Sequence, residues 1–297
     1  MNKHPMSWPI ALLHVCLRLA SHLPLSSLHA LGAGLGRVLW WSNRRPRRIV
    51  ERNLSLVLTQ DDAKTRQTIA RSALVETGRA VAEVAKVWSG RPDHALRFVR
   101  QVHGAARLDA AIRRGRGVII AAPHLGCWEL LSYWLAARTP LAIVYRAPRR
   151  TWLEPLLLRA RGASGIEQVR AEGASVRSLY RRLAAGGVVG ILPDQQPRQG
   201  EGAWAPFFGV PVLTMVLIAR LARRTGAEVI LAFAERLPKS AGFDIHVLPA
   251  PDGIADADLE VACSALNRGI ESCVRLAFTQ YQWAYKRFPR EAGAPRP

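Results

Sequence analysis

The chain has 297 residues, with 42 Lys and Arg against 22 Asp and Glu, a formal net charge of +20 and 49% hydrophobic residues. This composition excludes a disordered chain, and the length allows a substantial core in one large domain or two small ones. Four cysteines without a C-x-x-C pair exclude a disulfide-dense scaffold, a zinc ribbon and a thioredoxin-type motif.

The excess of positive charge indicates an anionic partner, such as nucleic acid, a membrane surface, or an acidic protein or substrate. Arginine binds phosphate and carboxylate groups through two parallel hydrogen bonds, which favours partners of this kind. A genome that favours arginine codons is the alternative explanation, although it does not account for the deficit of acidic residues. The arginines gather at residues 44–48, 113–116, 146–150, 177–182 and 220–224.

The amino-terminal segment, residues 8–41, is strongly apolar. Arg18 and Pro24 interrupt it, so it is a poor membrane-spanning helix and fits a tilted, broken or interfacial one better. Two tryptophans end the segment, and an arginine cluster follows at once, as is typical of an anionic membrane surface. We therefore expect a membrane-associated helical segment over residues 1–45. A buried amphipathic helix pair is the alternative.

Further along the chain, helical and strand patterns alternate between residues 106 and 250. This alternation predicts an α/β fold with a mixed central sheet and helices on both faces. The expected helices lie within 47–90, then at 106–114, 125–138, 151–165, 175–185, 211–227 (a turn and a helix) and 256–288. The expected strands lie at 117–124, 141–146, 166–170 and 186–197, followed by an antiparallel pair at 228–236 and 243–250.

Ligands of such sheets bind beyond the carboxyl ends of the strands. This rule selects three short segments, which run from His124 to Glu129, from Tyr145 to Arg150 and from Asp194 to Pro197.

The strongest candidates for catalytic residues are His124 and Glu129, which both lie in the segment PHLGCWE. On one continuous helix, a spacing of five residues separates two side chains by about 140°, so they cannot meet. If His124 lies in the loop before the helix, its ring can fold back toward Glu129, with Gly126 leaving room. A carboxylate on one imidazole nitrogen would fix the tautomer and let His124 act as a general base. A helix-start histidine with an exposed Glu129 is the alternative, and spacing alone favours it.

Other chemistries have weaker support. Cys127 is a possible thiol nucleophile, but it stands in an apolar helix start, where cysteine usually serves packing. The segment lacks the HExxH spacing of a zinc protease, and the chain contains no GxSxG elbow, P-loop or post-strand GxGxxG. We therefore expect neither a metal nor a cofactor.

The segment PHLGCWE resembles the H-x4-D/E signature of glycerolipid-type acyltransferases. The whole chain resembles one branch, the late acyltransferases of lipid A biosynthesis, which include lauroyl and myristoyl transferases. The segments that carry this resemblance appear in the family's order, and they are RRIVERNLSLVL, PHLGCWE, VYRAPRR, GILPDQQP, WAPFFGVPVLT and QYQWAYKRF.

The resemblance implies an α/β sandwich with a membrane-associated amino-terminal helix, so residues 46–297 form the expected acyltransferase domain. It also implies transfer of a fatty acyl chain from acyl carrier protein to a hydroxyl of a lipid A precursor. His124 and Glu129 are the implied catalytic dyad. The residues implied in substrate binding or charge stabilisation are Arg146, Arg149, Asp194 and Gln195.

The implied location is the cytoplasmic face of a bacterial inner membrane, with an anionic membrane surface as a partner. An acyltransferase with another phospholipid or glycolipid acceptor remains an alternative, because the motifs describe the chemistry rather than the acceptor. A nucleic-acid-binding protein is the second alternative. It is disfavoured because the chain lacks a helix-turn-helix or RNA-binding motif, and we expect no nucleic-acid partner.

Overall fold

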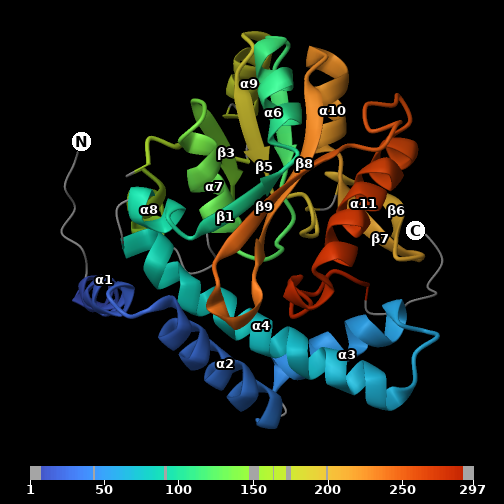
Figure 1. Ribbon diagram of the computed structural model, residues 1–297. Coiled ribbons are helices and arrows are strands. Elements are labelled where there is room, and N and C mark those ends of the chain that lie inside the picture. Colours follow the sequence, from blue (N-terminus) through green and yellow to red (C-terminus); the bar gives the residue numbers. More distant parts are fainter. Residues whose placement is uncertain are drawn as a thin grey trace.

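The computed structural model describes most of the chain, in an α/β arrangement shown in Figure 1. The described residues are 8–42, 44–89, 92–146, 154–162, 164–171, 175–198 and 200–289. Arg149, one of the predicted site residues, lies outside them.

A seven-stranded sheet forms the centre, in the order β1-β9-β8-β2-β5-β3-β4. All neighbouring strands are parallel except β8 and β9, so the predicted mixed sheet and its antiparallel pair are confirmed. The strands are β1 (Val99–His103), β2 (Val118–Ala121), β3 (Leu141–Tyr145), β4 (Glu167–Arg170), β5 (Val188–Ile191), β8 (Glu228–Arg236) and β9 (Phe243–Pro249).

Helices cover both faces of the sheet, as predicted. The strands β2, β3 and β5 are buried at every position, which is typical of parallel strands with helices on both sides. One face packs against α5 (Pro92–Leu96), α6 (Ala105–Arg113) and α7 (Trp128–Ala136). The other face packs against α9 (Ser175–Ala184), α10 (Leu217–Thr225) and α11 (Leu259–Leu276). Another helix, α8 (Glu154–Gly162), precedes β4.

The amino-terminal helices lie together across the bottom of the molecule in Figure 1. They are α1 (Trp8–Ser21), α2 (Leu25–Trp41), α3 (Arg45–Val57) and α4 (Ala63–Ser89). Helices α2 and α4 cross so closely that a Cβ atom added at Gly32 would lie 2.6 Å from the Gly78 carbonyl oxygen. Among the described residues, the helices are all too short or too polar to cross a membrane.

A buried ion cluster ties these helices to the sheet. Glu83 on α4 accepts a hydrogen bond from the Arg236 guanidinium on β8, and it also contacts the His29 ring on α2 at 2.8 Å. Arg236 also binds Glu76 at 2.6 Å. Burial raises the pKa of Glu83, but Arg236 and His29 outweigh this effect and hold that pKa below its usual value.

The secondary structure differs from the sequence predictions in three places. The expected helix over 256–288 ends at Leu276, and the 3-10 turn Phe278–Gln280 and an irregular segment follow it. The segment 202–215 forms an antiparallel hairpin of β6 (Gly202–Phe207) and β7 (Val210–Met215), which the sequence analysis missed. The strand β1 was not predicted either, and its burial pattern is mixed because it lies at the sheet edge.

Candidate active site

The register of two neighbouring strands brings His124 and Asp194 together. Strands β2 and β5 are paired in parallel, and Ala121 lies opposite Ile191. His124 follows Ala121 by three residues, and Asp194 follows Ile191 by the same number. The two side chains therefore leave the carboxyl edge of the sheet side by side, where ligands of such sheets bind.

Asp194 accepts two hydrogen bonds from His124. Its Oδ1 lies 2.7 Å from the ring Nδ1, and its Oδ2 lies 2.9 Å from the main-chain nitrogen. The carboxylate is 3% exposed. Burial pushes the pKa of Asp194 upward, but the charge and hydrogen bonds of His124 outweigh burial and hold it below its usual value. An ionised carboxylate accepts hydrogen bonds only, so Nδ1 carries the proton and Nε2 presents a lone pair.

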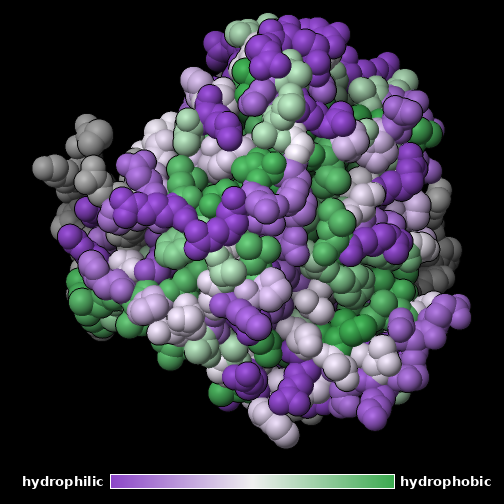
Figure 2. Space-filling view, in the orientation of Figure 1, coloured by the Kyte–Doolittle hydropathy of each residue, from purple (hydrophilic) through white to green (hydrophobic). Residues whose placement is uncertain are grey.

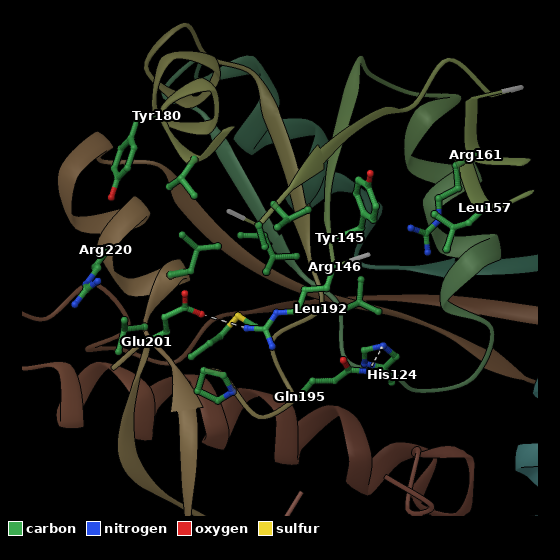
Figure 3. Close-up of a pocket in the computed structure, with 18 residues that line it drawn as sticks. His124, Tyr145, Arg146, Leu157, Arg161, Tyr180, Leu192, Gln195, Glu201 and Arg220 are labelled. Carbon is green, nitrogen blue, oxygen red and sulfur yellow. Dashed lines mark hydrogen bonds and ion pairs between the residues drawn. The ribbon is translucent and has the colours of Figure 1, made fainter. Parts of the chain in front are cut away.

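The Nε2 atom of His124 faces Gln195, and both residues line the cavity (Figure 3). The amide nitrogen Nε2 of Gln195 lies 3.2 Å from it. With Nδ1 protonated, the Gln195 amide donates this hydrogen bond. A hydroxyl donor that took the place of the amide would meet the same lone pair.

His124 opens onto a cavity of about 370 Å³. Its walls come from the carboxyl ends of β3 and β5 and from α8, α9 and α10. The mostly apolar wall residues are Val144, Tyr145, Leu157, Ala171, Val176, Tyr180, Ile191, Leu192, Pro197, Met215, Val216 and Leu217. The polar lining residues are His124, Arg146, Arg161, Gln195, Glu201 and Arg220. All three segments selected from the sequence therefore contribute to one cavity, which is large enough and apolar enough for an alkyl chain.

Arg146 follows β3, and its side chain lines the same cavity and extends toward Glu201 (Figure 3). Its Nη1 donates a hydrogen bond of 3.1 Å to the Gln196 carbonyl oxygen, and its Nη2 lies 3.5 Å from a Glu201 carboxylate oxygen. The side chain is 35% exposed. Its positive charge is thus part of the cavity lining. Its ion pair with Glu201 is long and partly exposed, so an anionic group can replace it.

Glu129 does not bond to His124, contrary to the arrangement expected from the sequence. It forms a two-pronged ion pair with Arg161 of α8, at 2.6 Å and 3.1 Å. Both side chains are less than 10% exposed, at 7% for Glu129 and 9% for Arg161. Burial raises the pKa of Glu129, but Arg161 outweighs burial and lowers it overall, with a smaller contribution from the charge of His124. The contact that was expected between His124 and Glu129 is made by Asp194 instead, and a catalytic role for Glu129 stays a prediction.

The loop that carries His124 is held by Gly126. This residue has φ +60°, and a Cβ atom there would collide with the Ala234 carbonyl oxygen on β8. Glycine meets both demands, because it tolerates positive φ and has no Cβ. The Cys127 amide then donates a hydrogen bond of 2.9 Å to the same Ala234 oxygen, which docks the loop on β8.

The carboxyl-terminal segment, residues 280–287, holds both members of the His124–Asp194 pair. The Gln282 amide donates a 3.0 Å hydrogen bond to the His124 carbonyl oxygen. The Gln196 amide, two residues after Asp194, donates one of 3.0 Å to the Tyr285 hydroxyl oxygen. These contacts give a structural role to the motif QYQWAYKRF, which in the sequence was recognised only as part of the family resemblance.

Asn53 on α3 fixes the same segment from the other side. Its buried side-chain amide donates hydrogen bonds of 2.8 Å and 2.7 Å to the carbonyl oxygens of Trp283 and Tyr285. A chain of contacts therefore runs from α3 through residues 280–287 to His124. Asn53 lies in the motif RRIVERNLSLVL. An asparagine on the apolar side of an amphipathic helix must satisfy its hydrogen bonds in the protein interior, and this pattern is the sequence signal that points to Asn53.

Two further chemistries find no support in the described part of the chain. No group of three or more His, Cys, Asp or Glu side chains there is arranged to hold a metal ion. Cys127 is buried, and burial raises the pKa of its thiol well above the ordinary value. Its thiol is therefore protonated at neutral pH and is a poor nucleophile.

Comparisons with known proteins place the whole chain in one family. Residues 2–290 match the family model described as bacterial lipid A biosynthesis acyltransferase. The chain is 25% identical to the lipid A biosynthesis lauroyltransferase of Escherichia coli K12, over 98% of this chain and 95% of the relative. It is 27% identical to the palmitoleoyltransferase of the same organism, over 96% and 92%. The phosphatidylinositol mannoside acyltransferase of Mycobacterium tuberculosis is 27% identical over 68% of this chain and 65% of the relative. Because the family model covers nearly the whole sequence, this chain belongs to the bacterial lipid A biosynthesis acyltransferases.

Proposed function

We propose that this protein transfers a fatty acyl chain from the thioester of acyl carrier protein to a hydroxyl group of a lipid A precursor. Membership of the family supports the acyl transfer and the lipid A-type acceptor. The observation that carries the mechanism is the 2.7 Å contact between the His124 ring and Asp194, with Nε2 facing Gln195 in the cavity lining.

In the proposed reaction, Nε2 of His124 takes the proton of the acceptor hydroxyl while the hydroxyl oxygen attacks the thioester carbonyl carbon. A tetrahedral oxyanion forms and collapses, the C–S bond breaks, and the leaving thiolate takes the proton back from His124. Asp194 stabilises the imidazolium that exists between these two proton transfers. No covalent acyl-enzyme is needed, because the acceptor oxygen attacks directly.

Two guanidinium groups of the cavity suit the negative charges of this reaction. Arg146 lines the cavity with a partly exposed charge, and we propose that it stabilises the oxyanion or a phosphate of the acceptor. Arg161 lines the cavity while it is bonded to Glu129, so its position is fixed before substrate arrives. The apolar walls between α8, α9 and α10 would hold the alkyl chain.

We also propose that the protein lies on the cytoplasmic face of the inner membrane through α1 and α2. Leu31, Leu35, Val38 and Trp41 form one exposed stripe along α2, with exposed fractions between 43% and 73%. Leu12, Val15 and Leu19 form a similar stripe along α1, and hydrophobic side chains gather at the lower left of Figure 2. Exposed apolar helices that end in an arginine cluster are typical of a helix lying in the membrane interface.

The direct test uses the purified full chain, a dodecanoyl thioester of acyl carrier protein and a lipid A precursor. Mass spectrometry should find the precursor heavier by one acyl chain, and the His124→Ala variant should give no such product. If the wild-type protein leaves the precursor unchanged and acylates another lipid, the proposed acceptor is wrong. Flotation with anionic vesicles tests the membrane proposal, and Leu31→Asp with Val38→Asp should abolish flotation.

A second acceptor class has its own support. The chain is similar to a phosphatidylinositol mannoside acyltransferase over 68% of its length. A phosphorylated glycolipid other than a lipid A precursor is therefore the second candidate acceptor. Offering both lipids in one reaction distinguishes them, because each acylated product has its own mass.

A further inference from the structure

One exposed surface next to the cavity carries positive charge without acidic partners. Helices α9 and α10, with the sequences SVRSLYRRLA and LIARLARRT, contain six arginines and no acidic residue. Arg182 pairs with Glu167, whereas the other five form no ion pair with any residue that the structure describes. These five exposed residues define the arginine face, and they are Arg177, Arg181, Arg220, Arg223 and Arg224.

The arginine face is costly for the isolated protein. Arg177 and Arg181 are one helical turn apart, and so are Arg220 and Arg224. Like charges at this spacing destabilise a helix by about 0.2–0.5 kcal/mol per pair. The Arg224–Tyr180 contact and the position of Arg181, Arg223 and Arg224 in the last turn of their helices offset part of this repulsion. No acidic side chain that the structure describes pairs with the five arginines, so an acidic partner would relieve the remainder on binding.

The arginine face meets the cavity at Arg220. Arg220 lines the cavity itself, as do Val176 and Tyr180 of α9. The guanidinium of Arg224 lies 5.1 Å from the centre of the Tyr180 ring, which joins the two helices at the cavity wall. A molecule bound at Arg220 would therefore lie at the wall of the cavity that His124 also lines (Figure 3).

The arginine face is also remote from the exposed apolar stripes of α1 and α2. Figure 1 shows α9 and α10 at the top of the molecule and α1 and α2 at the bottom, and Figure 2 shows hydrophilic side chains gathered at the top. A protein that rests on a membrane through α1 and α2 would present α9 and α10 to water. This arrangement favours a soluble acidic partner over a lipid surface.

We infer that the arginine face docks the acidic carrier protein that delivers the acyl thioester, so that its acyl arm enters the cavity beside Tyr180. This inference rests on the proposed function, in which the donor is such a carrier. Attraction between opposite charges speeds encounter by about 10-fold to 1,000-fold at low salt, and salt weakens it. The arginine face would thus set the rate of donor capture rather than the chemistry at His124.

The test compares two donors, dodecanoyl-acyl carrier protein and the uncharged S-dodecanoyl pantetheine. The variant is Arg177→Glu with Arg181→Glu on α9. The matched control is Arg107→Glu with Arg113→Glu on α6, which lies on the other face of the sheet. The third residue of each helix is an arginine, Arg107 in α6 and Arg177 in α9. With the carrier at low salt, kcat/KM of the α9 variant should fall at least about 10-fold, and the difference should shrink in high salt. With the pantetheine thioester, both variants should match the wild type.

The outcomes separate this inference from the proposed function. If the wild type prefers the carrier but the α9 variant keeps its kcat/KM, or the α6 variant loses as much, the docking surface is wrong and the donor assignment stands. If the wild type uses both thioesters equally well, the carrier assignment itself fails. If the α9 variant instead loses binding to vesicles of phosphatidylglycerol and keeps its kinetics with the carrier, the arginine face binds lipid.

Discussion

Asp194 holds His124 at two points, because one carboxylate oxygen binds the ring nitrogen Nδ1 and the other binds the main-chain nitrogen. Both groups on His124 are donors, and only a carboxylate offers two acceptor oxygens in this geometry. The pair is therefore matched to one charge state and one tautomer, in which Nε2 is free to take a proton.

Replacing Asp194 with Asn tests this match with almost no change of shape. The amide has one acceptor and one donor end, so it can satisfy either the main-chain nitrogen or Nδ1, but not both. We expect kcat to fall by about 100-fold to 10,000-fold, as it does when a general base loses its tautomer. Steady-state kinetics measure this loss, and near-wild-type turnover by a folded Asp194→Asn variant would remove Asp194 from the mechanism.

Glu129 and Arg161 should behave as a structural pair. Glu129→Gln leaves a buried guanidinium without its counter-charge, which should cost about 3–5 kcal/mol of unfolding free energy. In the double variant with Arg161→Gln, the loss should be smaller than the sum of the two single losses, and urea unfolding of all four proteins measures this coupling. If Glu129 instead served His124 directly, Glu129→Gln would lower kcat with little change in stability.

The Gly126→Ala variant should damage the loop that carries His124. The added Cβ collides with the Ala234 oxygen, and φ +60° is costly for alanine. We expect a loss of more than about 1 kcal/mol in stability together with a large fall in kcat. Gly34→Ala is the control, because nothing lies within 4 Å of a Cβ atom there, and alanine in the helix α2 should be neutral or stabilising. Equal thermal stability and turnover in the two variants would contradict the prediction.

The sequence located the active-site edge but not the pairing within it. Apolar runs identified β2, β3 and β5, and the position of ligands beyond their carboxyl ends selected His124, Arg146 and Asp194, which all approach one cavity. The partner of His124 was misassigned because Glu129 is near in sequence, whereas Asp194 is near only through the pairing of β2 with β5. Strand order in a parallel sheet depends on long-range packing, which local patterns do not report.

The end of the chain was misread for a related reason. Helical periodicity predicted one helix to residue 288, but the chain turns after Leu276 so that Phe278, Tyr281 and Trp283 can pack against one another and against the hairpin. The ring of Phe207 on β6, for example, lies 5.9 Å from the ring of Tyr281. Burial of these aromatic rings outweighs the free energy of continuing the helix.

Acid should unfold the protein through its buried carboxylates. The pKa values of Glu83, Glu129 and Asp194 are each held below the usual value by a hydrogen-bonded partner that outweighs burial, which is Arg236 with His29 for Glu83, Arg161 for Glu129 and His124 for Asp194. A carboxylate with a lowered folded-state pKa binds protons more readily when the chain is unfolded, so its stabilisation is present above the unfolded-state pKa of about 4. It is lost as the pH falls through the lower folded-state value.

Urea unfolding between pH 7 and pH 3 should therefore give a free energy that is steady above about pH 5 and falls steeply below about pH 4. The Glu83→Gln variant should be less stable at pH 7 and should show a shallower fall, because one of the three titrating groups is gone. An unfolding free energy that rises on acidification, or an unchanged slope in Glu83→Gln, would contradict this assignment of charge to the buried pairs.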